Sequence, residues 1–146
     1  MKKAAILLIL SFTTLIGYSQ IKGIDFSSAP LVVYDEQLEA HWGELIKLET
    51  DGGYMYTIIY QNTAVGLKRL IEKAEKILSA NNLSLYSPDS SSDLFASFVD
   101  GIHDYSNLHL AISVDESEIV RLWYYNGYRI ILGCTSDVYA ISFFKD

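Results

Sequence analysis

The feature that most constrains this chain is a pair of strand-forming runs joined by Asn126 and Gly127. Residues 119–125 and 128–133 are rich in β-branched and aromatic side chains, which favour extended backbone. Asn and Gly both tolerate the positive φ angles of a type I′ turn, whose twist matches that of the strands it joins. The sequence therefore predicts a β-hairpin with a two-residue turn.

A two-residue turn also determines which side chains share a face, because successive residues of a strand point to opposite sides of a sheet. One face of the hairpin then carries Ile119, Arg121, Trp123, Tyr125, Tyr128, Ile130, Leu132 and Cys134. The other face carries Val120, Leu122, Tyr124, Arg129, Ile131 and Gly133.

Further strands are predicted on both sides of this hairpin. Residues 108–114 alternate strictly between apolar and other side chains, as a half-buried strand does, and residues 138–144 can pair back on the hairpin. Together these runs predict a C-terminal antiparallel meander of about four strands. Nearer the N-terminus, residues 44–50 and 54–60 flank a Gly-rich turn and predict a second hairpin, preceded by a turn or short helix over 35–41.

One long helix is predicted over residues 64–79, with Asn62 or Thr63 as its N-terminal cap. Its apolar residues recur at spacings of three and four and form one stripe, which must cover a sheet. We expect the Val120, Leu122 and Tyr124 face to be that seat. The predicted fold class is α+β, with this amphipathic helix packed on a mostly antiparallel sheet of six or seven strands.

Residues 1–19 have the pattern of a secretory signal peptide: Lys2 and Lys3, an apolar run, and then small or polar residues. The apolar run is shorter than the roughly 20 residues of a membrane-spanning helix. We expect cleavage after Ser19, a single domain over residues 20–146, and an extracytoplasmic location, periplasmic or secreted. No second apolar run predicts a membrane span in the mature chain.

The net charge of the chain limits which classes of molecule it is expected to bind. The whole chain has a net charge of −7, and removal of Lys2 and Lys3 leaves nine basic residues against 18 acidic ones, a net charge of −9. An acidic surface disfavours nucleic acid and anionic membranes and favours a basic protein partner. The alternative is that the charge serves solubility alone. The single cysteine, Cys134, excludes an intrachain disulfide and is expected to be a small packing residue.

The face opposite the expected helix seat is the candidate binding surface. It combines aromatic rings that can stack on a planar or sugar-like ligand with a cation and a titratable group: Arg121, Trp123, Tyr125, Tyr128 and, from the neighbouring predicted strand, His109. The alternative is that residues 44–60 cover this face, so that the rings are ordinary core residues.

Catalytic and metal signals are weak. His103, Asp104 and His109 lack a third ligand at a diagnostic spacing, and no nucleophile or phosphate-binding motif is present, so we predict no catalytic residue, metal or cofactor. The leading hypothesis is an exported, non-enzymatic binding module, including a protein inhibitor or sequestering partner. Two alternatives are a small hydrolase using His109 with Cys134 or Ser113, and a structural subunit of an envelope assembly.

Overall fold

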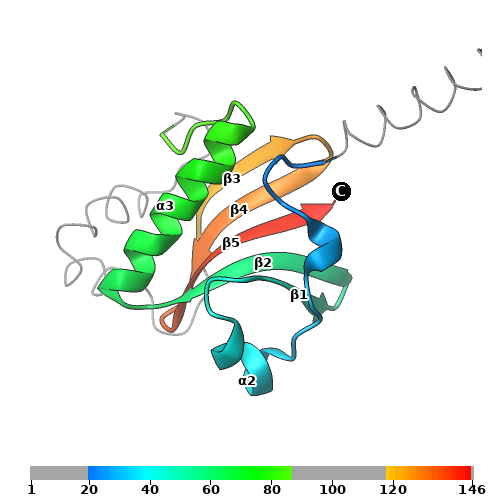
Figure 1. Ribbon diagram of the computed structural model, residues 1–146, viewed down its shortest axis with the longest axis vertical. Coiled ribbons are helices and arrows are strands. Elements are labelled where there is room, and N and C mark those ends of the chain that lie inside the picture. Colours follow the sequence, from blue (N-terminus) through cyan, green and yellow to red (C-terminus); the bar gives the residue numbers. More distant parts are fainter. Residues whose placement is uncertain (1–19, 87–117, 146) are drawn as a thin grey trace, which may run out of the picture.

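A computed structural model describes residues 20–86 and 118–145 of the chain. Its elements, in chain order, are η1 (Phe26–Ser28), α2 (Tyr34–Gln37), η2 (Leu38–His41), β1 (Leu45–Thr50), β2 (Gly53–Gln61), α3 (Ala64–Ala80), β3 (Glu118–Tyr125), β4 (Tyr128–Cys134) and β5 (Val138–Lys145). The strands form one antiparallel sheet in the order β1-β2-β5-β4-β3, and α3 lies across it (Figure 1). The predicted α+β class is confirmed.

The two predicted hairpins are also confirmed. Asn126 and Gly127 have φ angles of 50° and 77°, as a type I′ turn requires, and Tyr125 pairs with Tyr128. β1 and β2 form the N-terminal hairpin, and β3, β4 and β5 follow one another in a meander. The predicted strand at 108–114 lies outside the described residues.

The predicted helix corresponds to α3. The Thr63 hydroxyl accepts a hydrogen bond from the backbone N–H of Gly66 at 2.9 Å, which satisfies one of the free donors in the first turn. A Cβ atom at Gly66 would collide with the carbonyl oxygen of Gln61, the last residue of β2. The absence of a side chain therefore lets α3 begin directly beside the strand that it follows.

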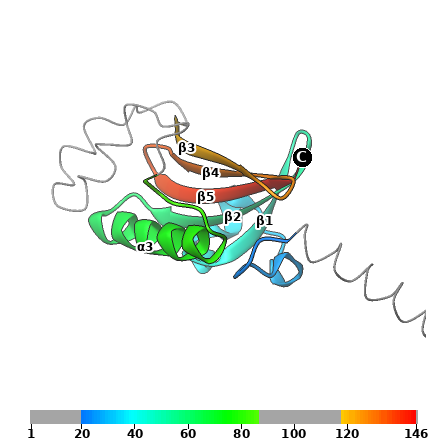
Figure 2. The same cartoon turned by 90° about the horizontal axis from the view of Figure 1, so that it is seen from above.

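The predicted seat of the helix was wrong. α3 packs on the face that carries Trp123, Tyr128, Ile130 and Leu132, and helix and sheet form two layers (Figure 2). Tyr124, on the other face, is 68% exposed. The larger continuous apolar area lies on the aromatic face, so burying that face removes more apolar surface from water.

A β-bulge explains why the alternation fails at the start of β3. The register shifts between Ile119, which pairs with Gly133, and Arg121, which pairs with Leu132, so Val120 is the extra residue of the bulge. Val120 and Arg121 are consequently both buried on the helix side of the sheet, whereas Ile119 is 57% exposed. Strict alternation predicts the reverse, with Ile119 on the face of Trp123 and Val120 on the face of Tyr124, and this prediction is wrong for both residues.

The N-terminal arm contributes to both layers. Phe26 packs on the helix side, stacked on Tyr128 with ring centroids 5.2 Å apart. The chain then follows the edge of β1, where Val32 N–H donates to Lys47 O at 2.9 Å, and Leu38 packs against the other face. This arm shields the edge of β1, and below we call the two sides of the sheet the helix face and the groove face.

Candidate functional site

The residues predicted to bind a ligand lie mostly in the core. Arg121, Trp123 and Tyr128 are only 3%, 6% and 7% exposed, and Tyr125 is half-buried against the same core. His109 lies outside the described residues. The covering elements are α3 and the N-terminal arm, rather than the expected residues 44–60.

The polar groups of these side chains have structural partners. Arg121 Nη1 donates to the carbonyl oxygen of Leu85 at 2.7 Å, and Trp123 Nε1 donates to that of Ser84 at 3.1 Å. Both acceptors belong to the segment that follows α3, so the two side chains hold this segment against the sheet. The alternative of a covered face therefore holds for Arg121, Trp123 and Tyr128, and their contact with a ligand stays a prediction.

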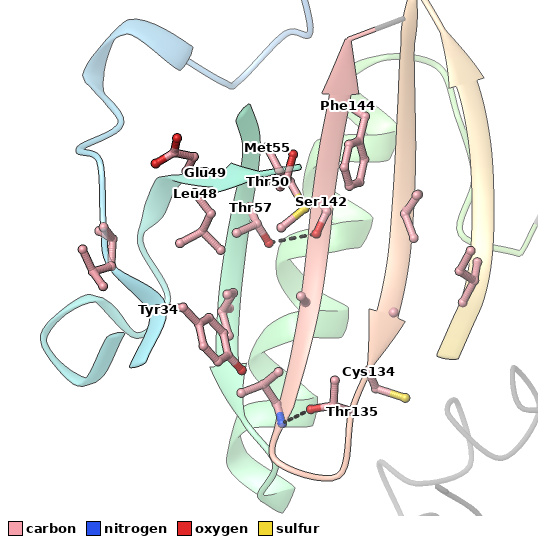
Figure 3. Close-up of a pocket in the computed structure, with 18 of the residues that line it drawn as sticks. Tyr34, Leu48, Glu49, Thr50, Met55, Thr57, Cys134, Thr135, Ser142 and Phe144 are labelled. Carbon is pink, nitrogen blue, oxygen red and sulfur yellow. Dashed lines mark hydrogen bonds between the residues drawn. The ribbon is translucent and has the colours of Figure 1, made fainter. Parts of the chain in front are cut away.

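The groove face instead carries an open apolar hollow with a volume of about 720 Å³. It lies over the middle of the sheet, on the side away from α3 (Figure 3). Known small-molecule sites occupy roughly 300–1,000 Å³ and are lined mainly by apolar groups. This hollow, which we call the groove, is therefore the candidate site.

Small side chains on adjacent strands form the floor of the groove. Gly133 of β4 pairs with Ala140 of β5, and Ser142 of β5 pairs with Thr57 of β2. Larger side chains at these positions would fill the space above the sheet. The hollow therefore results from side-chain size on one face of three neighbouring strands.

Exposed apolar residues form the rim of the groove. Leu31, Val33, Tyr34 and Ile119 line it and are 58%, 51%, 42% and 57% exposed. Tyr34 lies toward the end of the groove near Thr135, which is in the turn between β4 and β5, and Phe144 lies at the opposite end (Figure 3). A concentration of exposed large apolar side chains around one concavity is typical of a binding surface.

The floor contains one buried polar pair. Thr57 Oγ1 and Ser142 Oγ are 2.9 Å apart, and the Thr57 hydroxyl donates to the carbonyl oxygen of Ile141 at 3.2 Å. With the Thr57 proton used in this way, the proton between the two hydroxyl groups comes from Ser142. Both protons then remain within the protein, and the floor offers a ligand acceptor oxygens but no donor.

A cation lies at the Phe144 end of the groove face. The exposed guanidinium of Arg129 is 5.6 Å from the centre of the Phe144 ring, which itself lines the groove. Arg129 pairs with Phe144 on one side and with exposed Tyr124 on the other. Glu49, on β1, is exposed at the opposite flank, and its carboxylate points away from Thr57 and Ser142 (Figure 3).

Other chemical groups give no comparable site. Cys134 is 4% exposed and packs with the helix-face core, and its sulfur points away from Tyr34 and Thr135 (Figure 3). Within residues 20–86 and 118–145, no three His, Cys, Asp or Glu residues are grouped so that they could hold a metal ion. The part of the chain that the structure describes also contains no helix that is both long and apolar enough to cross a membrane.

The groove residues were not predicted, because aromatic and charged side chains were taken as the signal of a binding surface, and the floor of the groove consists of small ones. The signal was the alternation of large and small residues in β5: Tyr139, Ile141 and Phe143 fill the helix face, whereas Ala140 and Ser142 leave space on the other. Comparison with family models, with curated proteins and with solved structures finds no match to the chain. The geometry of the groove is therefore the main support for a proposed function.

Proposed function

We propose that this protein is an exported, non-enzymatic binding module whose groove takes a small apolar ligand. The observation that carries the proposal is an open hollow of about 720 Å³, with a floor of small side chains and a rim of exposed apolar ones. Exposed apolar area of this kind is costly in water, and a ligand that covers it gains that free energy on binding.

Export is part of the same proposal. The N-terminal 19 residues have a signal-peptide pattern, and the acidic composition suits a protein that stays soluble outside the cytoplasm. A carrier of apolar molecules fits this setting, because such molecules need a protein to cross an aqueous compartment.

Binding of Nile red, a neutral dye that fluoresces in apolar surroundings, tests the proposal. Ala140→Leu places a branched side chain on the floor of the groove and should weaken dye binding about tenfold, an effect of about 1.4 kcal/mol. Titration of the purified protein with the dye measures this change, and circular dichroism checks that the variant is folded.

Val65→Phe is the matched control for added bulk. Val65 is 61% exposed on α3, on the far side of the sheet from the groove, so the dye affinity should not change. Equal dye binding by the wild type and folded Ala140→Leu would exclude the groove as the site.

The described groups on the groove face give no support to the hydrolase hypothesis, since Cys134 is buried against the helix-face core and His109 lies outside the described residues. An inhibitor or sequestering role toward a basic protein predicts an affinity that falls steeply with added salt. Binding of a neutral dye in the groove should be nearly independent of salt, so ionic strength separates the two forms of binding.

A further inference from the structure

We infer that the ligand of the groove is a single-chain amphiphile with a carboxylate head group, whose tail lies on the floor and whose head meets Arg129. This inference rests on the proposed function and names its ligand class. It is carried by the position of Arg129, which lies over the ring of Phe144 at one end of a mostly apolar groove.

Arg129 is positioned by the sheet itself. In β4 it alternates with Tyr128 and Ile130, which are buried on the helix face, so its side chain lies on the groove face. The guanidinium lies 5.6 Å from the centre of the Phe144 ring, and that ring lines the end of the groove. A carboxylate at this end can accept charge-assisted hydrogen bonds from the guanidinium while the attached chain continues along apolar surface.

The floor favours the tail of the ligand over its head group. The Thr57 and Ser142 hydroxyl protons are both used within the protein, so a carboxylate above them would meet only oxygen lone pairs. An alkyl chain loses nothing there, because it needs no hydrogen-bond donor. The middle of the groove therefore suits the tail.

The β1 flank is also unfavourable for an anion. Glu49 lies on β1, three strand spacings from β4, which corresponds to about 14 Å. Its negative charge, although it points away from the floor, gives a second anion no attraction on that side, whereas Arg129 attracts one on the other. This end of the groove therefore has a positive charge on the β4 side and a negative charge on the β1 side. A negative head group should lie on the β4 side.

Displacement of Nile red by dodecanoate and by 1-dodecanol tests the head group with the tail held constant. At pH 8 and low salt, Arg129→Gln should weaken dodecanoate binding about fivefold, the effect of one exposed ion pair, and leave dodecanol binding unchanged. Glu49→Gln should strengthen dodecanoate binding by less than about twofold. Arg69→Gln, which removes an exposed cation of α3 on the far side of the sheet, is the charge-matched control.

The outcomes separate this inference from the function on which it rests. If both ligands displace the dye but Arg129→Gln affects them equally or not at all, the head-group assignment is wrong and the apolar site remains. If neither displaces the dye and Ala140→Leu binds it like wild type, both fail. A dimer in sedimentation that Ala140→Leu dissociates and dodecanoate does not would assign the groove to a second copy of the chain and overturn the inference.

Discussion

The two faces of the sheet differ in what covers them. On the helix face, α3 and the N-terminal arm bury nearly every large side chain, and the polar tips of Arg121 and Trp123 bind backbone carbonyls. On the groove face, the arm covers only the part near β1 and β2, and the remainder ends in small side chains and exposed rims. Aromatic and charged residues therefore hold the fold together here, whereas small residues make the candidate site.

Two neighbouring phenylalanines, one on each face, should show the largest difference in stability between the two faces. Phe143 is fully buried on the helix face, and Phe144 lines the groove. Phe143→Ala should lower the free energy of unfolding by about 3–5 kcal/mol, because it leaves a cavity in the core. Phe144→Ala should cost about 1 kcal/mol, since its ring is only partly removed from water. Urea denaturation measures both; equal losses would mean that the two faces contribute alike to stability.

Two amide side chains, one buried and one exposed, test how much hydrogen bonds contribute to stability on each side of the sheet. Asn81 is 2% exposed, and its side chain accepts from Lys22 N–H at 2.8 Å and donates to the carbonyl oxygens of Lys22 at 3.0 Å and Ile77 at 2.8 Å. Gln37, which is exposed at the end of α2, accepts a hydrogen bond from the backbone N–H of Val33 at 3.0 Å. Asn81→Ala leaves buried groups unsatisfied and should cost about 2 kcal/mol.

Gln37→Ala is the control for the loss of an amide and should cost about 0.5 kcal/mol, because water replaces its contact. The two thermal unfolding curves should differ clearly in midpoint. A destabilisation by Gln37→Ala as large as that by Asn81→Ala would contradict the view that the arm is fixed mainly on the helix face.

The floor of the groove offers a smaller effect. Thr57→Val keeps the shape of the side chain but removes its hydrogen bonds to Ser142 and Ile141, at a cost of about 1 kcal/mol. Dye affinity should be at least as high as in wild type, because the floor becomes more apolar. Ser142→Ala should lower the free energy of unfolding less in the Thr57→Val variant than in the wild type, because the hydrogen bond between the two residues is already lost. If the losses of the two substitutions simply add, the two hydroxyl groups are not coupled.

Much of the fold could be predicted because its signals are local. The Asn126-Gly127 turn and the Thr63 cap act within a few residues, and α3 shows its apolar stripe at a spacing of three to four. The seat of α3 was mispredicted, because periodicity identifies two faces and does not say which one is covered. The bulge at Val120 added a local shift that strict alternation cannot reveal.

The candidate site could not be predicted for a related reason. Side chains such as Arg121 and Trp123 suit both a ligand and a core, and the structure shows their polar groups bound to the carbonyls of Leu85 and Ser84. Those carbonyls belong to a segment about 36 residues away in the sequence. The groove, by contrast, exists because Ala140 and Ser142 are small on the face away from α3, and their size becomes informative only once the seat of α3 is known.

Alkaline pH should destabilise the protein through the helix face. Burial raises the pKa of the Tyr60 phenol above its ordinary value of 10.0; Glu72 also raises it, and Arg69 partly opposes this shift. Above about pH 10 the unfolded chain loses this proton while the folded chain retains it, so stability present at lower pH is lost as pH rises. Urea unfolding at pH 9, 10 and 11 should show a smaller decline for Tyr60→Phe than for wild type. Tyr54→Phe, which removes an exposed phenol from the same strand, is the control, and a decline unchanged by Tyr60→Phe would argue against a burial effect at this position.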